Sequence, residues 1–551
     1  MNILICLKMI SRSTYTDAFG QEVPEARLDS GNLCGNPADL FALELALRIR
    51  DAEPDTTITV LSMGPETVEP ILREALSAGA DRAVHICDPI FAGSDTIATA
   101  KALCAALRLL PRQDLIVCGR KAMDSETGHI APQLAALTGM NYIPNVLNYG
   151  PCDKESVEFY TAGGEHVRLG TEGFPALISV INGPDTLRLP TIALLRKSRT
   201  AAVERLDGKA LGLDAKSAGA NASGTETIRI VESDFADRGG TKEFDTEKGI
   251  RILAKEIDAV RQKRKQGVSA RPIPAFPTPE SGAQELWVVT EKLSASALGL
   301  IRKAEELAKE RSLALRVIEL ARTGLLSRPA ELLKELTALF SQIGPTAILF
   351  EKTTLLSDIA PAFAALTGSG ITADCTALEW DERYGLLQIR PTFGGRRIAV
   401  NRSLSPPYVA TVRRGVFGGG AITDEGGDDL ETAPLVLSGG MGLGCKEHFD
   451  GLFRLAGKTG AEIGASRAAV AAGYVSYDRQ IGQTGVSVRP LLYVAFGISG
   501  AVQHLSGILN AERVIAVNRD PAAPIHRFSD YSLIADAPEV LSALNEIFGN
   551  P

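Results

Sequence analysis

Short apolar runs alternate with longer stretches of helical periodicity along most of the chain. Residues 2–8, 57–63, 83–88 and 114–119 are apolar or β-branched and bounded by turn residues, which is typical of buried strands. The stretches between them repeat apolar positions every three to four residues, most clearly over 37–52. This alternation predicts an α/β fold with parallel sheets that helices cover on both faces.

One helical unit occurs twice. Residues 130–139 and 359–368 are identical at eight of ten positions, and each follows an apolar strand and a short polar loop. Two copies of one unit predict two domains of the same fold, with the second beginning near residue 285. Chance similarity between two alanine-rich helices is the alternative.

Two segments rich in proline, glycine or acid interrupt the pattern. Residues 267–284 contain four prolines and no helical period, which is typical of a linker, and an amphipathic, charge-rich helix is expected just before them. Residues 415–431 are rich in glycine and acid and predict a hinge. A strand, a glycine loop and a helix then open a last α/β domain.

Composition narrows the classes of function. The net charge of −8 is not concentrated in blocks, and 5% of residues are aromatic, which argues against a nucleic-acid surface. Eight cysteines without a CxxC pair, and six histidines away from them, indicate reduced thiols in a cytoplasmic protein without a metal site. Cys6 and Cys118 lie on predicted strands and are expected to be buried packing residues. The N-terminus lacks the basic start of a signal peptide, and no apolar run of about 18 residues predicts a membrane span.

Glycine or polar residues follow five predicted strands of the last domain. The first case, LVLSGGMGLG at 435–444, has the strand, glycine loop and helix that bind a pyrophosphate. Its spacing does not match GxGxxG, and a tight turn would use the same glycines. The carboxyl ends of parallel strands meet at one edge of a sheet, so five such loops together predict a dinucleotide site.

This series of loops resembles the α-subunit FAD domain of the electron transfer flavoproteins. The motifs SGGMGLG, GASRAAVAAGYVSYDRQIGQTG, LYVAFGISGAVQHLSG and IAVNRDPAAPIHRFSDY follow the family's order and spacing. Met441 stands where the family usually has arginine, so one cationic contact to the cofactor is missing, and we expect an apolar filler there. The resemblance implies FAD contacts at Ser466, Arg467, Ile481, Gly482, Gln483, Thr484, Ser499, Gly500, Ala501, Val502, Gln503, His504, Asn518, Asp536 and Ala537.

Three of these residues are expected to tune the flavin. The resemblance implies that Arg467 holds a fixed positive charge near flavin N5 and that Thr484 donates its hydroxyl to the N5/O4 edge. His504, in the first turn of an expected helix, would contact O2 and balance charge at N1. The alternatives are a surface arginine, a turn hydroxyl and a structural histidine. Gln483 and Ser499 are expected to fix the ligand's position.

The rest of the chain resembles other parts of the same family. NPADLFALELALRIRD and GRKAMDSETGHIAPQLAALTG resemble the β-subunit, and GITADCTALEWDERYGLLQIRPTFGGRRIAV resembles the N-terminal domain of the α-subunit. The resemblance implies a fusion with the β-subunit first, which also accounts for the repeat. The expected parts are a β-like domain (1–200), its C-terminal arm (201–266), the linker (267–284), an α-like N-terminal domain (285–414), the hinge (415–431) and the FAD domain (432–551).

The β-like part carries the family's second nucleotide site. Members keep AMP there or, when they bifurcate electrons, a second FAD; the short loop at 124–132 and the segment 91–100 favour FAD, although His129 and Ala131 depart from the pattern. An NADH site is in doubt because the middle domain lacks an expected strand. The implied contacts are Cys6, Asn36, Pro37, Ala38, Asp39, Met63, Asp124, Thr127, Gly128, His129, Ile130 and Ala131.

The resemblance implies a carrier of single electrons through FAD. It would accept them from a flavin dehydrogenase of the acyl-CoA dehydrogenase type and pass them to a quinone oxidoreductase or similar acceptor, while the linker and the hinge let the FAD domain swing. Two alternatives stay open. One is a bifurcating protein with two FADs that oxidises NADH, and the other is a non-redox adenine-nucleotide module.

Overall fold

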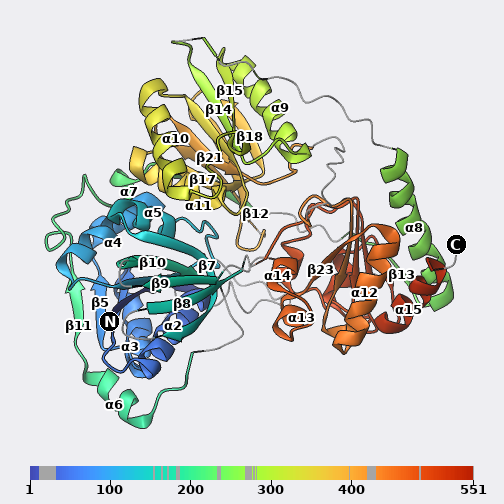
Figure 1. The fold of residues 1–551 in the computed structure, drawn as a ribbon, viewed down its shortest axis with the longest axis horizontal. Coiled ribbons are helices and arrows are strands. Elements are labelled where there is room, and N and C mark those ends of the chain that lie inside the picture. The colour runs from blue at the N-terminus through green and yellow to red at the C-terminus, as the bar shows by residue number, and fades with distance from the viewer. Residues whose placement is uncertain are drawn as a thin grey trace.

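The chain folds into three α/β domains, which we call N-terminal (blue to teal in Figure 1), middle (yellow) and C-terminal (orange to red). Each contains a mainly parallel sheet, so the predicted fold class is confirmed. The computed structural model describes residues 1–11, 33–152, 156–162, 166–170, 173–181, 187–232, 238–266, 276, 279–280, 282–395, 397–418, 430–482 and 485–549.

The N-terminal domain is built on a nine-stranded sheet whose order is β11-β5-β4-β1-β6-β10-β7-β8-β9. Its strands run parallel except at one edge, where β7, β8 and β9 form an antiparallel meander. The elements are β1 (Asn2–Cys6), β2 (Met9–Ser11), β3 (Leu33–Gly35), α2 (Pro37–Ala52), β4 (Thr57–Met63), η2 (Glu66–Val68), α3 (Glu69–Ala78), β5 (Arg82–Ile86), η3 (Pro89–Phe91), α4 (Thr96–Leu109), β6 (Leu115–Gly119), α5 (Ile130–Thr138), β7 (Asn141–Cys152), β8 (Ser156–Thr161), β9 (His166–Gly170), β10 (Ala176–Val180), α6 (Ile192–Thr200), β11 (Val203–Leu206) and α7 (Gly219–Ala222).

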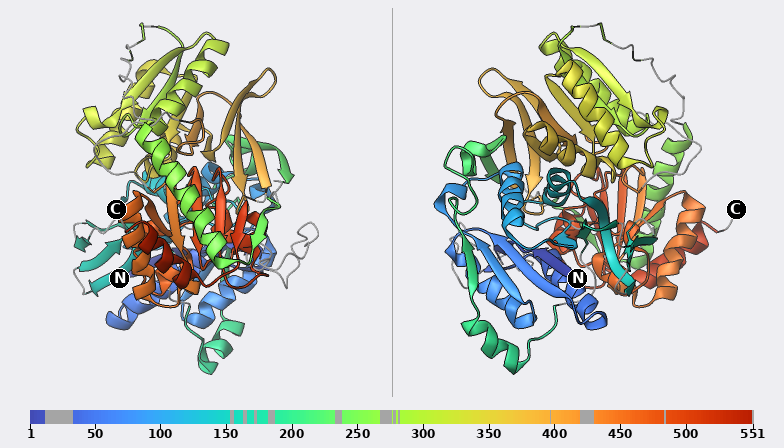
Figure 2. Two further views of the ribbon diagram at one scale, coloured as in Figure 1. Left: turned by 90° about the vertical axis from the view of Figure 1, so that its right-hand side faces the viewer. Right: turned by 60° about the vertical axis from the view of Figure 1, so that its left-hand side comes forward.

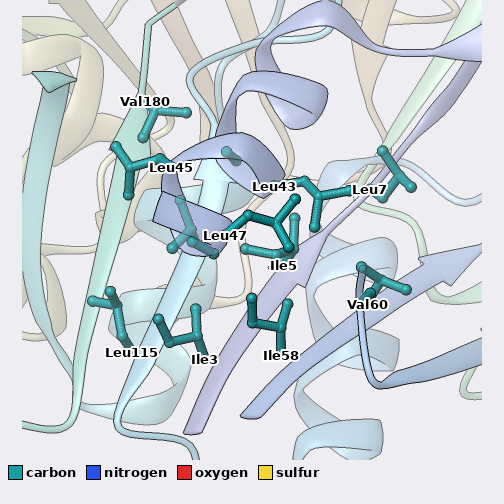
Figure 3. Close-up of a cluster of buried hydrophobic side chains, with 14 of the residues drawn as sticks. Ile3, Ile5, Leu7, Leu43, Leu45, Leu47, Ile58, Val60, Leu115 and Val180 are labelled. Atoms are coloured by element: carbon teal, nitrogen blue, oxygen red, sulfur yellow. The ribbon is translucent and has the colours of Figure 1, made fainter. Parts of the chain in front are cut away.

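Helix α2 holds this sheet together from one face. Pro37 starts the helix, where its fixed φ suits the first turn and its missing N–H costs nothing. Figure 3 shows Leu43 and Leu47 of α2 among the strand residues Ile5 and Ile58, and all four are fully buried. Burial of each such side chain contributes about 1.5–3 kcal/mol. The pattern predicted over 37–52 is therefore a core helix, as expected.

The middle domain repeats this arrangement. Its parallel sheet has the order β15-β14-β16-β21-β17, which matches β4-β1-β6-β10-β7 of the N-terminal domain. The repeated helices α5 and α11 both end at a left-handed glycine, Gly139 (φ 69°) and Gly368 (φ 68°), and they pack against each other. The predicted repeat is confirmed. The elements are β14 (Glu285–Thr290), α9 (Ala295–Glu310), β15 (Ala314–Glu319), η5 (Leu320–Arg322), α10 (Pro329–Ile343), β16 (Ala347–Glu351), α11 (Leu356–Thr367), β17 (Ile371–Cys375), β18 (Ala377–Asp381), β19 (Gly385–Thr392), β20 (Arg397–Ser403) and β21 (Tyr408–Val412).

The C-terminal domain has a six-stranded parallel sheet with the order β13-β26-β25-β24-β22-β23. Its elements are β22 (Leu435–Gly439), η6 (Met441–Leu443), α12 (Lys446–Thr459), β23 (Glu462–Ala465), α13 (Arg467–Ala471), η7 (Tyr477–Arg479), β24 (Leu492–Phe496), α14 (Val502–Leu505), β25 (Val514–Val517), η8 (Pro524–Phe528), β26 (Tyr531–Leu533) and α15 (Ala537–Ile547).

The elements between Thr225 and Gln266 tie the middle and C-terminal domains together. Strand β12 (Thr225–Glu232) pairs with β20 of the middle domain, and β13 (Thr241–Glu243) extends the C-terminal sheet beside β26. Helix α8 (Thr246–Gln266), the amphipathic helix expected before the linker, packs Leu253 and Ile257 into the C-terminal core. Figures 1 and 2 show α8 lying along that domain, far from the N-terminal sheet.

Two expected segments lie largely outside the described residues, namely most of the linker 267–284 and residues 419–429 of the hinge. Within the described part of the chain, no helix combines the length and the apolar character that crossing a membrane would require.

Candidate functional site

The carboxyl ends of the C-terminal strands bring the predicted FAD residues together. The backbone N–H of Ser466, after β23, donates to the carbonyl of Gly439 in β22 (3.0 Å). The Asn518 side chain, after β25, donates through Nδ2 to the carbonyl of Ile498 (2.9 Å), which follows β24. Four loops are thus joined at one edge of the sheet, as the sequence predicted.

The glycines of this edge let loops pack on one another. Gly482 has φ of 138°, and a Cβ there would lie 2.4 Å from the carbonyl oxygen of Gln503. A Cβ at Gly442 would lie 2.7 Å from the Cα of Gly497. Both distances are too short for any side chain, so these positions require glycine. The sequence predicted that these glycine loops bind a dinucleotide, and the structure adds that their glycines let the loops pack against each other.

The two helices expected at this edge are short. Ser466 caps α13, where its hydroxyl accepts a hydrogen bond from the N–H of Ala469 (3.4 Å), but α13 has five residues and α14 has four. Few peptide dipoles are aligned in a single turn, so α14 adds little positive potential at its N-terminus. The expected contribution of a helix terminus beside His504 is correspondingly small.

His504 is a buried, neutral side chain. Its Nδ1 donates to the carbonyl of Ile481 (3.1 Å), and its Nε2 accepts a hydrogen bond from the hydroxyl of Tyr493 (2.7 Å). Burial lowers the pKa of His504 to about 4, so the ring carries no charge near pH 7. Both ring nitrogens have protein partners, and the expected contact of His504 with flavin O2 and N1 stays a prediction. This geometry favours a role in holding the 481 loop.

The other expected FAD contacts differ in their surroundings. Arg467 is exposed at the start of α13. Met441 is 45% exposed at the tip of the first glycine loop, and its expected role as an apolar filler beside the cofactor stays a prediction. Asp536 stands at the N-cap of α15, before the buried Ala537. Gln483 and Thr484 lie outside the described residues.

A cavity of about 600 Å³ lies where the three domains meet. This volume is typical of sites for drug-sized and cofactor-sized ligands. The N-terminal domain contributes Arg120 and Lys121, the middle domain contributes Lys352 and Arg414, and the C-terminal domain contributes Tyr477 and Ser487. We call it the junction cavity. Acidic side chains, among them Glu126, Asp374 and Asp478, also line it, so charges of both signs face the cavity.

The ionisable side chains around the junction cavity differ in their surroundings: Asp374 is held in ion pairs, whereas burial dominates the pKa values of Lys121 and Tyr477. Asp374 pairs with Lys352 (2.9 Å) and Arg413 (2.7 Å), which hold the pKa of its carboxyl far below the usual range against the effect of burial. Burial lowers the pKa of Lys121 to about 8. Burial raises the pKa of Tyr477 to about 12, although Arg467 and Arg120 nearby act in the opposite direction. Tyr477 is therefore a neutral phenol between cations from two domains.

The expected second-site residues surround the ends of β1 and β6. The Asp39 carboxylate accepts hydrogen bonds from the backbone N–H groups of Lys8 (2.8 Å) and Gly119 (3.0 Å), which fastens the two strand ends to each other. Burial raises the pKa of Asp39 to about 6. Asn36 bonds to the backbone of the loop after β6. Asn36 and Asp39 thus shape the site through backbone contacts.

The middle domain holds the loop at 124–131. Its Thr392 hydroxyl donates to the carbonyl of Asp124 (3.1 Å), and the N–H of Gly394 donates to Glu126 (2.7 Å). His129 is 1% exposed, and burial lowers its pKa to about 3, so it is neutral.

The remaining expected contacts lie around this loop. Ala38, Thr127, Gly128 and His129 line the junction cavity, whereas Pro37 begins α2 and Ala131 is buried in α5. Cys118 is buried, as predicted, while its register partner Cys6 is only partly buried. Met63 and Ile130 are partly buried beside the same core.

Sequence reasoning missed Arg390. This residue on β19 is 5% exposed, and its Nε has no hydrogen-bond partner among the residues that the structure describes. Its charge is close enough to contribute, after burial, to lowering the pKa of His129. The signal was the alternation in β19, where Gln388, Arg390 and Thr392 occupy the buried face and the intervening positions are only partly buried. Polar residues on the inner face of a strand indicate an interface or a ligand.

Comparisons with known proteins agree with this geometry. An electron transfer flavoprotein domain model matches residues 29–211 and again 291–436, and an electron transfer flavoprotein FAD-binding domain model matches 429–509. The chain is 38% identical over 244 residues to the electron transfer flavoprotein subunit alpha of Thermoanaerobacterium thermosaccharolyticum, covering 39% of this chain and 74% of that protein.

Two further relatives match the same family. The subunit alpha of Clostridium acetobutylicum is 34% identical over 319 residues, which cover 47% of this chain and 95% of that protein. The lactate dehydrogenase (NAD(+),ferredoxin) subunit LctC of Acetobacterium woodii is 34% identical over 239 residues, which cover 38% of this chain and 57% of that protein. The matched regions span more than half of the chain, and one lies mainly in each of the three domains of the fold, so the chain belongs to the electron transfer flavoprotein family.

Proposed function

We propose that this chain is a β-first fusion of the two subunits of an electron transfer flavoprotein. It carries electrons through FAD from a flavin dehydrogenase, such as the acyl-CoA dehydrogenase type, to a quinone oxidoreductase or similar acceptor. The junction cavity carries the proposal, because its volume suits a tricyclic ring and its lining combines C-terminal residues with cations from the other two domains. The FAD-binding domain that contributes Tyr477 belongs to the matched region.

Bound FAD would supply the redox chemistry, and the residues of the chain would position it and set the local charge. The loops at Ser466, Ile481 and Ser499 would hold the cofactor at the strand ends. Arg467, at the start of α13, would favour negative charge on a reduced ring held at the strand ends, and Lys121 supplies a cation in the lining of the cavity. His504 would fix the 481 loop rather than carry charge.

The content of bound cofactors tests this function. Denatured, purified protein should release at least one FAD per chain, and the intact protein should be yellow and accept electrons from a reduced flavin dehydrogenase. A colourless protein that takes up no flavin would instead support the non-redox adenine-nucleotide module.

Arg390 favours a second candidate function, in which the N-terminal site holds another FAD and the protein bifurcates electrons from NADH. A buried guanidinium without a partner at Nε suits a ligand with acceptor atoms better than a purely structural role. The LctC relative, whose name includes both NAD(+) and ferredoxin, points to the same chemistry. One FAD plus one AMP per chain, with no reduction by NADH, would exclude it.

Substitution Arg390→Leu should separate ligand binding from folding. We expect the second nucleotide to bind about tenfold to a hundredfold more weakly, because hydrogen bonds to charged groups contribute about 1.5–3 kcal/mol. We also expect the ligand-free protein to melt at a higher temperature, because the substitution removes a buried guanidinium whose Nε has no hydrogen-bond partner in the described part of the chain. Isothermal titration with AMP and with FAD, and calorimetric melting, measure the two effects.

Arg322→Leu is the matched control, since the side chain of Arg322 is 76% exposed. It should change neither quantity. Unchanged nucleotide affinity in Arg390→Leu would remove the residue from the site, and a lower melting temperature would show that Arg390 has a structural partner.

Helix α6 offers a surface for the dehydrogenase partner. Leu189 and Ile192 are 92% and 72% exposed, and Leu195 on the same segment is 41% exposed. Figure 1 shows α6 at the outer corner of the N-terminal domain, where a second protein has open access. Clustered exposed apolar side chains mark protein contacts, and Lys197 and Arg199 in the last turn suit an acidic rim on the partner.

We expect Leu189→Ala to slow electron uptake from the dehydrogenase by a factor of about five or more, since a central apolar contact is worth about 1 kcal/mol or more. Stopped-flow reduction at rising dehydrogenase concentration measures this loss, while FAD content should stay unchanged. Leu109→Ala removes a side chain of 54% exposure at the end of α4 and should have no effect. Equal rates for the two variants would exclude α6 as the docking surface.

A further inference from the structure

A buried ion pair joins the N-terminal and middle domains beside the junction cavity. Arg120, directly after β6, contacts Asp358 on α11 through Nη2 (3.1 Å), and the two side chains are 16% and 10% exposed. The hydroxyl of Tyr142 also donates to Asp358 (3.2 Å). Burial raises the pKa of Asp358, an effect that Arg120 and Tyr142 partly oppose, and Asp358 raises the pKa of Arg120 against the effect of burial.

The same guanidinium holds the 124–131 loop. Nη1 of Arg120 donates to the carbonyl of Gly128 (2.9 Å), where the backbone is left-handed with φ of 68°. A planar guanidinium fixes the angle between its donors, so anchoring one nitrogen on Asp358 orients the other toward the loop. The middle domain therefore sets the position of Gly128 through Arg120.

The internal repeat explains why Asp358 can do this. The repeated sequence begins at Ile130 in one copy and at Ile359 in the other. Directly before it stand His129 and Asp358, which therefore occupy equivalent positions. The helices α5 and α11 pack against each other. In the N-terminal copy this position is a buried neutral histidine, whereas in the middle copy it is a carboxylate that reaches across the interface.

We propose that Arg120 and Asp358 are positioning residues for the N-terminal nucleotide site, through which the middle domain controls how tightly that site binds a nucleotide. The inference rests on the proposed second nucleotide site. It adds that the contact between Arg120 and Asp358 of the middle domain controls how tightly that site binds a nucleotide. Asp358 does not line the cavity and acts through Arg120, which lines it and holds Gly128 there.

The test uses full-length protein freed of nucleotide at the N-terminal site, with AMP and then FAD as the titrated probes. Asp358→Asn should weaken binding of both probes about tenfold or more, and Asp358→Glu, which keeps the charge, should recover most of the affinity. FAD bound to the C-terminal domain should be unchanged. Asp258→Asn, on the partly exposed α8, is the control and should behave as wild type.

A double variant distinguishes positioning of the nucleotide site from a role of Arg120 and Asp358 in stability alone. Arg120→Met/Asp358→Leu removes both buried charges, so stability should be kept or increased, yet nucleotide binding should stay weak and amide hydrogen exchange should accelerate in residues 124–131. Affinity restored in this double variant would overturn the proposal, as would wild-type affinity in Asp358→Asn. Absence of binding in the wild type would instead refute the second nucleotide site, and the inference would fall with it.

Discussion

Gly482→Ala should destabilise the C-terminal domain by about 2–6 kcal/mol and release its FAD. Strain at a residue with φ of 138° costs about 1–3 kcal/mol. Forcing a methyl group to within 2.4 Å of the Gln503 carbonyl adds about 1–3 kcal/mol of overpacking. Because this contact joins the 481 loop to the loop that carries His504, both walls of the expected flavin site should shift. Urea unfolding and the flavin content of the purified variant measure the effect.

Gly457→Ala provides the matched control. A Cβ at Gly457 would meet no atom within 4 Å, and the residue lies inside α12. Alanine should therefore stabilise the helix by about 0.5–1 kcal/mol and leave flavin content unchanged. If Gly482→Ala retained FAD and wild-type stability, the close packing of the two loops would not be what requires glycine.

Mild acid should destabilise the C-terminal domain through His504. The folded pKa of about 4 lies below the unfolded value of about 6.5, so the unfolded state binds the proton first as the pH falls. The stability contributed by the neutral ring is complete above pH about 6.5 and is lost as the pH falls through 4. The loss amounts to about 3 kcal/mol from this residue alone.

Urea unfolding followed by flavin fluorescence between pH 7 and 4 measures this slope. His504→Asn should be less stable at pH 7, because Tyr493 loses its acceptor, but its stability should depend less on pH by the same amount. His166→Asn, at a side chain that is 50% exposed, should keep the wild-type slope. An unchanged slope in His504→Asn would show that other groups govern acid unfolding.

Much of the fold was predictable because its signals are local. The runs at 2–8 and 57–63 became β1 and β4, and 37–52 became α2 with the predicted bounds. The expected helix at Val502 shrank to a single turn, because Gly497 and Gly500 need positive φ and the following segment must turn back against the 481 loop. The edge strands β8 and β9 were not expected, since a short antiparallel meander has little periodic signal.

The positions of the loops in the candidate site were also predictable from the sequence, whereas the charge states of its side chains were not. Motif spacing placed Ser466, Ile481 and Asn518 at one sheet edge, which hydrogen bonds between their loops confirm. The charge state of His504 could not be predicted, because its pKa follows from burial and from contacts with Ile481 and Tyr493. Arg390 was missed because its burial and its closeness to His129 of another domain are set by packing between residues far apart in the chain.

The sequence by itself determined the α/β fold, the repeat and the order of the nucleotide-binding loops, because strand and helix periodicity and glycine spacing act over a few residues. The tertiary structure alone decided that residues 225–266 complete two other sheets and that cations from two domains line one cavity. It also decided that Asp358 reaches Arg120 across the repeat. These features depend on burial and on contacts between residues far apart in the chain, and such contacts form only when the domains pack together.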